Sequence, residues 1–320
     1  MPSLKEIKNR ITSVQSTRKI TSAMKMVASS KLHHAQQMIE NMLPYESMLE
    51  HILKSFLASD VEAKGSITQP REVKTVALLV FSSNSSLCGG FNANVLKMMQ
   101  KVVEKYKEKG IEIVVYPVGR KVAEKVQKLG LKSAGNFTQL ADKPNSIQCA
   151  EIGRQLQEDF DAGVVDKVEM IYHHFKSAGS QILQKKVLLP IDIESAMDYD
   201  HERDLKSTIV TEKAVEYLKK NQKASEYENE EGKALNDNFI VEPDMQTVLS
   251  MLVPRYVNLM LYTALLDSNA SEHAARMVAM QTATDNADEL LRELNLQYNK
   301  SRQQAITSEL LDIVGGSVNN

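Results

Sequence analysis

The residues best suited to phosphate chemistry lie in one short loop, 82–92, which reads SSNSSLCGGFN. A glycine-containing loop between a strand and a helix is a common place for a phosphate to bind. This loop, however, has neither the G-x-G-x-x-G spacing nor the Lys-Ser/Thr that follows the glycines of a Walker loop. The preferred interpretation of Gly89 and Gly90 is a tight turn or close packing against another chain, with nucleotide binding as the alternative.

Other reactive side chains do not form a catalytic arrangement. Cys88 would need a neighbouring base to act as a nucleophile, so a buried structural thiol is the simpler expectation. His173-His174 lies in an expected strand and His33-His34 in an expected helix, so the rings of each pair point apart and cannot readily hold one metal ion. Glu230-Glu231 lies in a polar stretch and is expected to be solvated. We therefore predict no catalytic residue, no cofactor and no metal ligand.

The elements that hold these residues alternate between strands and helices. Strands are expected at 73–81, 111–118, 167–176 and 181–189, and helices at 92–109, 120–129 and 146–160. Gly110 and Gly130 close two of the helices, and Ser146 is a candidate cap for the third. This alternation predicts a small α/β domain with a mostly parallel sheet, whose last two strands form an antiparallel hairpin.

The last third of the chain has the pattern of one very long helix. About eight heptads of apolar residues in one register predict a coiled-coil seam. At about 1.5 Å per residue, a helix over 245–314 would be on the order of 100 Å long, so we expect it to protrude as a mechanical part. The seam positions are Leu249, Leu252, Tyr256, Leu259, Leu266, Ala270, Met277, Met280, Ala287, Leu291, Leu294, Tyr298 and Ala305.

A second seam, at the start of the chain, is the expected partner. It turns polar in its middle, at Arg18, Thr21 and Lys25. Ser3 and Glu6 fit a capping box, and Pro44 is expected to end or kink the helix. We predict an antiparallel pair of terminal helices, the alternative being two separate amphipathic helices that lie on one globular core. The apolar seam positions are Leu4, Ile7, Ile11, Val14, Ala28, Leu32, Ala35, Ile39 and Met42.

Composition narrows the class of protein. The 320 residues are enough for two domains, and we find no apolar run near the ~18 residues that span a membrane and no secretory signal. Cys88 and Cys149 lie far apart, which indicates a reducing compartment. The first thirty-odd residues are basic and the stretch 192–244 is acidic. Nucleic-acid binding is disfavoured because no aromatic residues are interleaved with the basic ones.

Three segments resemble the gamma subunits of F-type ATP synthases: IKNRITSVQSTRKITSAMKMVASSKL near the start, the loop SLCGGFN, and ALLDSNASEHAARMVAMQTATDNADELLRELNLQYNKSRQQAITSELLDIVGG near the end. The resemblance implies an antiparallel coiled coil of the N- and C-terminal helices with an inserted Rossmann-like α/β domain. It implies a non-catalytic rotor of the central stalk, which transmits torque between the c ring and the ring of alpha and beta subunits. The alternative is a stand-alone Rossmann-like nucleotide-binding enzyme.

The same resemblance gives partners and a location. The expected partners are the alpha and beta subunits, the epsilon subunit and the c ring, without nucleic acid, at the cytoplasmic face of the bacterial inner membrane. The expected divisions are an N-terminal coiled-coil helix (1–58), the Rossmann-like domain (72–192), an acidic polar insertion (193–241) and a C-terminal coiled-coil helix (242–318). The insertion is expected to act as a passive brake or as a docking surface for epsilon.

Motif matches also assign contact residues. The expected beta-subunit contact and coupling residues are Met24, Lys25, Arg276, Arg302, Gln303, Thr307 and Glu309. An apolar tip beyond residue 305 is expected to turn inside a hydrophobic sleeve, and Phe239 and Glu242 are the expected contacts with the c ring and epsilon. The chain departs from the family where Asn84-Ser85-Ser86 replaces the usual Asp-Arg-Gly, which puts any ion pair made there in doubt.

Overall fold

The computed structural model describes residues 3–59, 71–191 and 240–318. Two helices, α1 (Leu4–Ser59) and α9 (Met245–Val318), carry the two ends of the chain. The contacts divide the chain into two units, which are described separately: a coiled-coil unit (Met1–Ser29 with Arg276–Asn320) and an α/β unit (Ser30–Ala275). Each of the two helices contributes residues to both units.

The α/β unit is built on a five-stranded sheet with the order β3-β2-β1-β4-β5. All neighbouring strands are parallel except β4 and β5, which form an antiparallel hairpin. The predicted sheet is therefore confirmed, apart from the two-residue β3, which the sequence pattern did not indicate. The strands are β1 (Thr75–Phe81), β2 (Glu112–Val118), β3 (Lys132–Ser133), β4 (Lys167–Ser177) and β5 (Ser180–Leu189).

The described part of this unit also contains four shorter helices: α2 (Phe91–Glu108), α3 (Arg120–Lys128), α4 (Thr138–Asp142) and α5 (Ser146–Asp161). The cap of α5 is Asn145 rather than Ser146, so that prediction is wrong by one residue. The extended backbone of Asn145 lets its side chain accept hydrogen bonds from the N–H groups of Ile147 (2.9 Å) and Gln148 (3.3 Å). An Ncap residue has this backbone conformation, whereas Ser146 is already helical.

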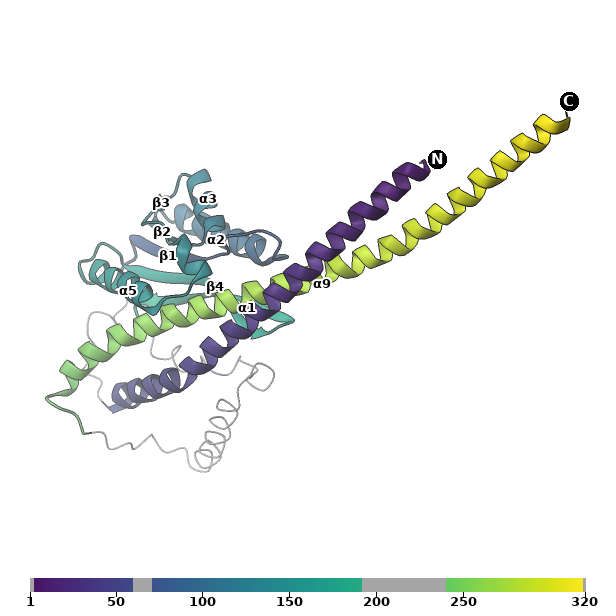
Figure 1. Ribbon diagram of the computed structural model, residues 1–320. Helices are drawn as coiled ribbons and strands as arrows, with labels where there is room; N and C mark the ends of the chain where they lie inside the picture. Colours follow the sequence, from purple (N-terminus) through teal and green to yellow (C-terminus); the bar gives the residue numbers. More distant parts are fainter. Residues whose placement is uncertain (1–2, 60–70, 192–239, 319–320) are drawn as a thin grey trace. The chain divides into compact units, whose positions relative to one another are not determined.

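Alternate residues of each strand point to opposite faces of the sheet, and helices cover both faces. Leu78, Val80 and Ile171 pack in one cluster with residues of α2 and α3. Leu79 and Met170 belong to a second cluster, which includes α5 and those parts of α1 and α9 that lie in the α/β unit. Figure 1 shows α5 running alongside α9. Since each buried Leu, Ile or Met stabilises by about 1.5–3 kcal/mol, both clusters hold helices firmly on the sheet.

The coiled-coil unit pairs α1 with α9 in the antiparallel sense. The capping box is present: the Ser3 N–H donates to Glu6 Oε2 (2.8 Å) and the Glu6 N–H donates to Ser3 Oγ (3.3 Å). Buried seam residues include Ile7, Ala287 and Leu294, as the periodicity predicted. This excludes the alternative of two separate amphipathic helices on one globular core.

Two prolines lie inside these helices without ending them. Helix α1 continues through Pro44 to Ser59, and α9 continues through Pro254. Of the two expected effects of Pro44, an end or a kink, the end of the helix is therefore wrong, although proline removes one N–H donor from the ladder. Burial of Leu49 and Leu53 beyond Pro44, in the core of the α/β unit, stabilises the continued helix.

By length and composition, the stretch Gln246–Leu311 of α9 is apolar enough to cross a membrane. The sequence pattern had not indicated such a stretch. Half of the most apolar segment of this stretch is buried inside the molecule. The core helix of a soluble protein can be equally long and apolar. Side chains such as Val257, Ala264 and Leu265, which are buried in the core of the α/β unit, account for that apolar character.

Candidate interaction surfaces

Two polar pairs fix the register of the coiled-coil unit. Arg18 Nε lies 2.6 Å from Asp288 Oδ1, and the hydroxyls of Thr21 and Thr284 lie 2.8 Å apart. Moving three residues towards the C-terminus of α1 therefore corresponds to moving four residues towards the N-terminus of α9, so the two helices are antiparallel. The polar middle of the N-terminal seam, predicted at Arg18, Thr21 and Lys25, is explained for the first two by polar partners on the facing helix.

The same register leaves the end of α9 without a partner from α1. The residue numbers of two facing positions add up to about 306. Leu4, at the start of α1, therefore faces a position close to Arg302 of α9. Beyond this point every described side chain except the half-buried Ala305 is exposed, and the large apolar ones are 49–68% exposed. They are Ile306, Leu310, Leu311 and Ile313. The tip of α9 is therefore a single helix with an uncovered apolar surface.

The predicted contact residues of the tip lie on two adjoining sides of α9. Gln303 and Thr307 are one turn apart and share one side, while Arg302 and Glu309, seven positions apart, share another. All four side chains are exposed. The Thr307 hydroxyl donates to the Gln303 carbonyl (2.9 Å), so Thr307 has its oxygen left to accept from a partner.

The predicted contact residues away from the tip are less accessible. Met24, Lys25 and Arg276 are each half-buried. Sequence reasoning missed the more exposed apolar residues beside them, Ile20 at 60% and Val27 at 58% exposed. The sequence could have identified them: the two residues lie outside the seam and are seven positions apart, so they share one side of α1.

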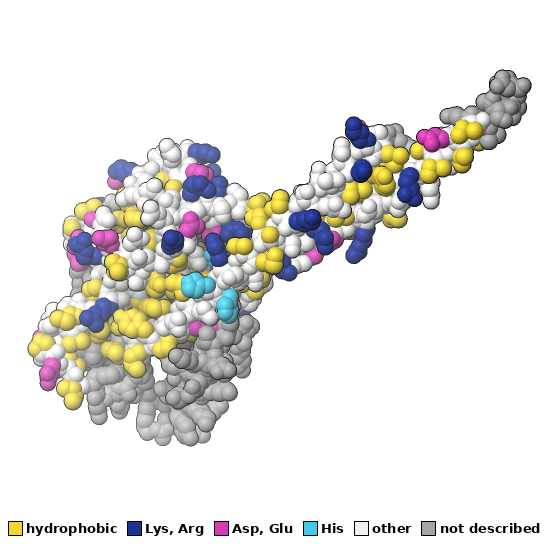
Figure 2. Space-filling model, in the orientation of Figure 1, with side chains coloured by type: hydrophobic (Ala, Val, Ile, Leu, Met, Phe, Trp, Pro, Cys, Tyr) yellow, Lys and Arg dark blue, Asp and Glu magenta, His cyan; other side chains and the backbone are white. Residues whose placement is uncertain are grey.

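Basic side chains accompany these apolar ones on the coiled-coil unit. Figure 2 shows Lys and Arg side chains distributed over its surface, with apolar side chains between them. On α1 the exposed basic residues include Lys8, Arg10, Arg18 and Lys19. Such a surface favours partners that present acidic groups around apolar contacts.

The expected contacts with the c ring and epsilon are only partly described. Glu242 is exposed, whereas Phe239 and residues 193–239 of the expected insertion (193–241) lie outside the described residues. Asp244, two residues after Glu242, caps α9: its carboxylate accepts from the Thr247 N–H (2.8 Å) and hydroxyl (2.7 Å). The bond from the backbone N–H, followed by that from the hydroxyl, lowers the pKa of Asp244. The sequence pattern had not identified this cap.

The loop 82–92 is closed by its own hydrogen bonds. Ser83 is fully buried; its hydroxyl donates to the Ser85 carbonyl (2.5 Å), and the Asn92 amide donates to that hydroxyl (2.8 Å). Cys88 is buried, with its sulfur 3.1 Å from Asn92 Nδ2, which is not a base. Gly89 has a positive φ of 57°, as the predicted tight turn requires. The loop is a structural element rather than a phosphate cradle.

Asn84, where the resemblance led us to expect an aspartate, has its own partners. Its amide donates to Asp142 Oδ2 (2.7 Å) and to the Thr138 carbonyl (2.7 Å), and its Oδ1 accepts from the Arg120 N–H (2.8 Å). These bonds tie together the ends of β1, β2 and the start of α4. A neutral amide thus organises this loop without an ion pair of its own.

Helix α9 fills the crevice where an open α/β sheet binds its ligand. Ligands of such sheets bind outside the carboxyl ends of the strands, where the strand order reverses, here beside β1 and β4. Asn269 of α9 donates to the Ala141 carbonyl (2.9 Å) at this place. The remaining cavity, between Phe81, Val118 and residues of α9, measures about 10 Å³, which is room for about one water molecule. A nucleotide cannot enter it.

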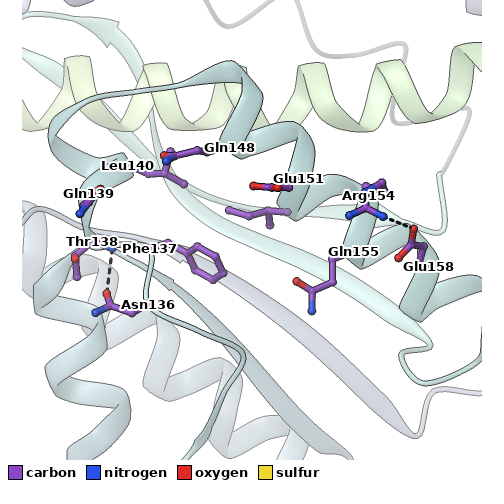
Figure 3. Close-up of a pocket in the computed structure, with 11 residues that line it drawn as sticks. Asn136, Phe137, Thr138, Gln139, Leu140, Gln148, Glu151, Arg154, Gln155 and Glu158 are labelled. Atoms are coloured by element: carbon purple, nitrogen blue, oxygen red, sulfur yellow. Dashed lines mark hydrogen bonds and ion pairs between the residues drawn. The ribbon is translucent and has the colours of Figure 1, made fainter.

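A larger groove lies between α4 and α5, with a volume of about 630 Å³. Figure 3 shows its polar side chains, including the ion pair between Arg154 Nη1 and Glu158 Oε1 (2.8 Å). Its lining contains no paired nucleophile and base. No group of three or more His, Cys, Asp or Glu side chains in the described part of the chain could hold a metal ion.

The two histidines of β4 point to opposite faces, as predicted. His173 stacks on Phe91 of α2, with ring centroids 4.4 Å apart, and burial lowers the pKa of His173 to about 4. His174 lies on the other face, with Nδ1 2.7 Å from Asp267 Oδ2 of α9. Both side chains are buried, and because they lie on opposite faces of the strand they cannot hold one metal ion together.

Comparisons with known proteins agree along the whole chain. The family model described as ATP synthase matches residues 3–318. The ATP synthase gamma chain of Phocaeicola vulgatus is 49% identical over 319 residues, covering 99% of this chain and 100% of its own. That of Bacteroides fragilis is 51% identical over 319 residues with the same coverage, and that of Fusobacterium nucleatum is 37% identical over 320 residues, covering 99% of each chain.

Solved structures show the same fold at lower identity. A chain of the Tetrahymena thermophila mitochondrial ATP synthase central stalk and c ring matches with a TM-score of 0.51 and 23% identity, covering 82% of this chain and 99% of its own. A chain of the Euglena gracilis OSCP/F1/c-ring structure matches with a TM-score of 0.57 and 16% identity, covering 99% of this chain and 94% of its own. With a family match over nearly its whole length and relatives about half identical end to end, the chain belongs to the ATP synthase gamma chain family.

Proposed function

We propose that the chain is the rotor subunit of the central stalk of an F-type ATP synthase and transmits torque between the c ring and the catalytic ring of alpha and beta subunits. The observation that carries this proposal is the end-to-end relationship with gamma chains. The coiled-coil unit fits the role, because a helix pair with a fixed register twists less easily than a single helix. No bond is made or broken by this chain, and catalysis belongs to its partners.

The stand-alone nucleotide-binding enzyme has no comparable support. The crevice at the carboxyl end of the sheet is filled by α9, and the loop 82–92 is closed on itself. We infer that a purified chain titrated with ATP or ADP shows no saturable binding. Tight binding would revive the enzyme interpretation.

The partners inferred are the alpha, beta and epsilon subunits and the c ring, in a membrane-associated complex at the cytoplasmic face of the bacterial inner membrane. Met24, Lys25, Arg276, Arg302, Gln303, Thr307 and Glu309 are the proposed contacts with beta, and Phe239 and Glu242 those with the c ring and epsilon. The division into 1–58, 72–192, 193–241 and 242–318 remains a prediction, as does the role of the insertion.

Co-expression tests this function. With alpha and beta subunits of a close relative, the chain is expected to co-purify as a complex that hydrolyses ATP and drives rotation of a bead attached to the gamma chain. Within that complex, replacing Arg302 and Gln303 by alanine is expected to lower the rate of ATP hydrolysis. Ser308→Ala is the matched control, because Ser308 is exposed on a different side of α9. Failure of the chain to join alpha and beta would overturn the rotor proposal.

A further inference from the structure

Within the α/β unit, α9 is attached to strand β4 by buried polar contacts. The Asp267 carboxylate lies 2.7 Å from His174 Nδ1, with 0% and 3% of the two side chains exposed. Because a carboxylate accepts hydrogen bonds, the imidazole donates from Nδ1. One turn further along α9, the buried Ser271 hydroxyl donates to the backbone carbonyl of His173 (3.2 Å). Two consecutive turns of α9 are therefore bonded to two consecutive residues of β4.

A third contact holds α9 from another direction. The Asn269 amide donates to the Ala141 carbonyl of α4 (2.9 Å). Successive helical residues are about 100° apart around the axis, so Asn269 lies about 200° from Asp267. Asp267 and Ser271, four residues apart, share the side that faces β4. The helix is thus held on two nearly opposite sides within five residues.

Hydrogen bonds are directional, so they resist rotation of α9 about its own axis more strongly than apolar packing does. Hydrogen bonds weaken steeply when their angle falls below about 120°, so a turn of α9 about its own axis breaks them. Apolar contacts are not directional, and their free energy depends mainly on the area buried. The buried polar groups also leave no low-energy alternative, because an unpaired buried donor or acceptor costs about 1–3 kcal/mol.

We propose that His174, Asp267, Asn269 and Ser271 form a torque joint, which prevents α9 from turning against the sheet when the rotor is loaded. This inference rests on the proposed rotor function and names the residues that would bear its load inside the α/β unit. They are positioning residues: they contact no substrate, and they act by keeping α9 at one angle to the sheet.

The test compares torsional stiffness in the assembled complex. Beta subunits are fixed to a surface, and a bead is attached to the α/β unit through Lys128→Cys on exposed Lys128. The angular fluctuation of the stalled bead then gives the stiffness. The first variant combines His174→Leu with Asp267→Leu, because apolar replacement of a buried pair is often neutral for stability. The second combines Asn269→Ala with Ser271→Ala and carries the test if the first does not assemble.

Both variants are expected to lower the stiffness by about twofold or more while ATP hydrolysis stays within about twofold of wild type. The matched control is Ser250→Ala with Thr282→Ala; among the described residues, these two hydroxyls bond only to carbonyls of α9 itself. The stiffness of this control is expected to be unchanged. Unchanged stiffness in the assembled variants would overturn the torque joint and leave the rotor function standing. A wild-type complex that does not rotate would overturn the rotor function, and the joint with it.

Discussion

Thr21 of α1 and Thr284 of α9 place their hydroxyl oxygens 2.8 Å apart across the coiled-coil seam. Each hydroxyl also lies close to a carbonyl of its own helix, Arg18 O at 3.0 Å and Met280 O at 2.8 Å. A polar pair in an apolar seam typically favours one register, because a slip would break the contact between the two hydroxyls and place each of them against apolar side chains. Together with the ion pair between Arg18 and Asp288, this pair therefore sets which residues of α1 and α9 face each other.

The register predicts which cysteine pairs can be joined. In a background with Cys88 and Cys149 replaced by serine, Thr21→Cys with Thr284→Cys is expected to form a disulfide on mild oxidation. Thr21→Cys with Leu291→Cys is the control and is expected to fail, because seven residues separate positions by about 10 Å along a helix. A mobility shift on a non-reducing gel measures both. Efficient joining of the control pair would contradict the register.

The neighbouring ion pair predicts a small effect. Arg18 and Asp288 are 2.6 Å apart, but their side chains are 48% and 39% exposed, so water screens the attraction. Arg18→Ala is expected to lower the free energy of unfolding by less than about 1 kcal/mol. Denaturant unfolding at low and high salt measures the loss, which should shrink as salt rises. A loss of several kcal/mol would contradict this assignment.

The seam and the sheet were predictable because their signals are periodic. Ile7, Ala287 and Leu294 are buried where the heptad pattern placed them. The two-residue β3 and the five-residue α4 are too short to show a period, and neither was predicted. The predicted cap of α5 was wrong by one residue because Asn145 and Ser146 are both good capping residues, and the backbone conformation decides between them.

Contacts between distant segments were not predictable from local pattern. His174 and Asp267 are 93 positions apart, and nothing in the strand or helix periodicity links them. The filling of the sheet crevice by α9 was missed for the same reason. The proposed partner contacts, such as Arg302 and Glu242, were found by resemblance alone, since a residue that binds another chain leaves no mark on its own fold.

The close approach of α5 to α9 predicts a steric effect at Gly153. A Cβ at this position would lie 2.0 Å from Asn258 Oδ1 and 3.2 Å from Leu261 Cδ1. Gly153→Ala is therefore expected to lower the free energy of unfolding by about 1–3 kcal/mol, as overpacking does. Denaturant unfolding measures the loss. In an Asn258→Ala background the same substitution should cost much less; an equal cost in both backgrounds would show that this contact is not responsible.

The buried ring of His173 predicts a dependence of stability on pH. Burial lowers the pKa of His173 from 6.5 to about 4, so between these pH values the unfolded chain binds more protons than the folded one. Stability therefore falls as the pH drops from 6.5 towards 4, by at most about 3 kcal/mol for this group. His173→Phe keeps a ring to stack on Phe91 and removes the titration.

The measurement is the free energy of unfolding of wild type and His173→Phe at several pH values between 6.5 and 4. The difference between the two curves isolates His173, because other titrating groups contribute to both. We expect wild type to lose stability relative to the variant as the pH falls, with a slope approaching that of one proton. Parallel curves would mean that the folded protein binds this proton as readily as the unfolded chain, and that the ring is accessible to water.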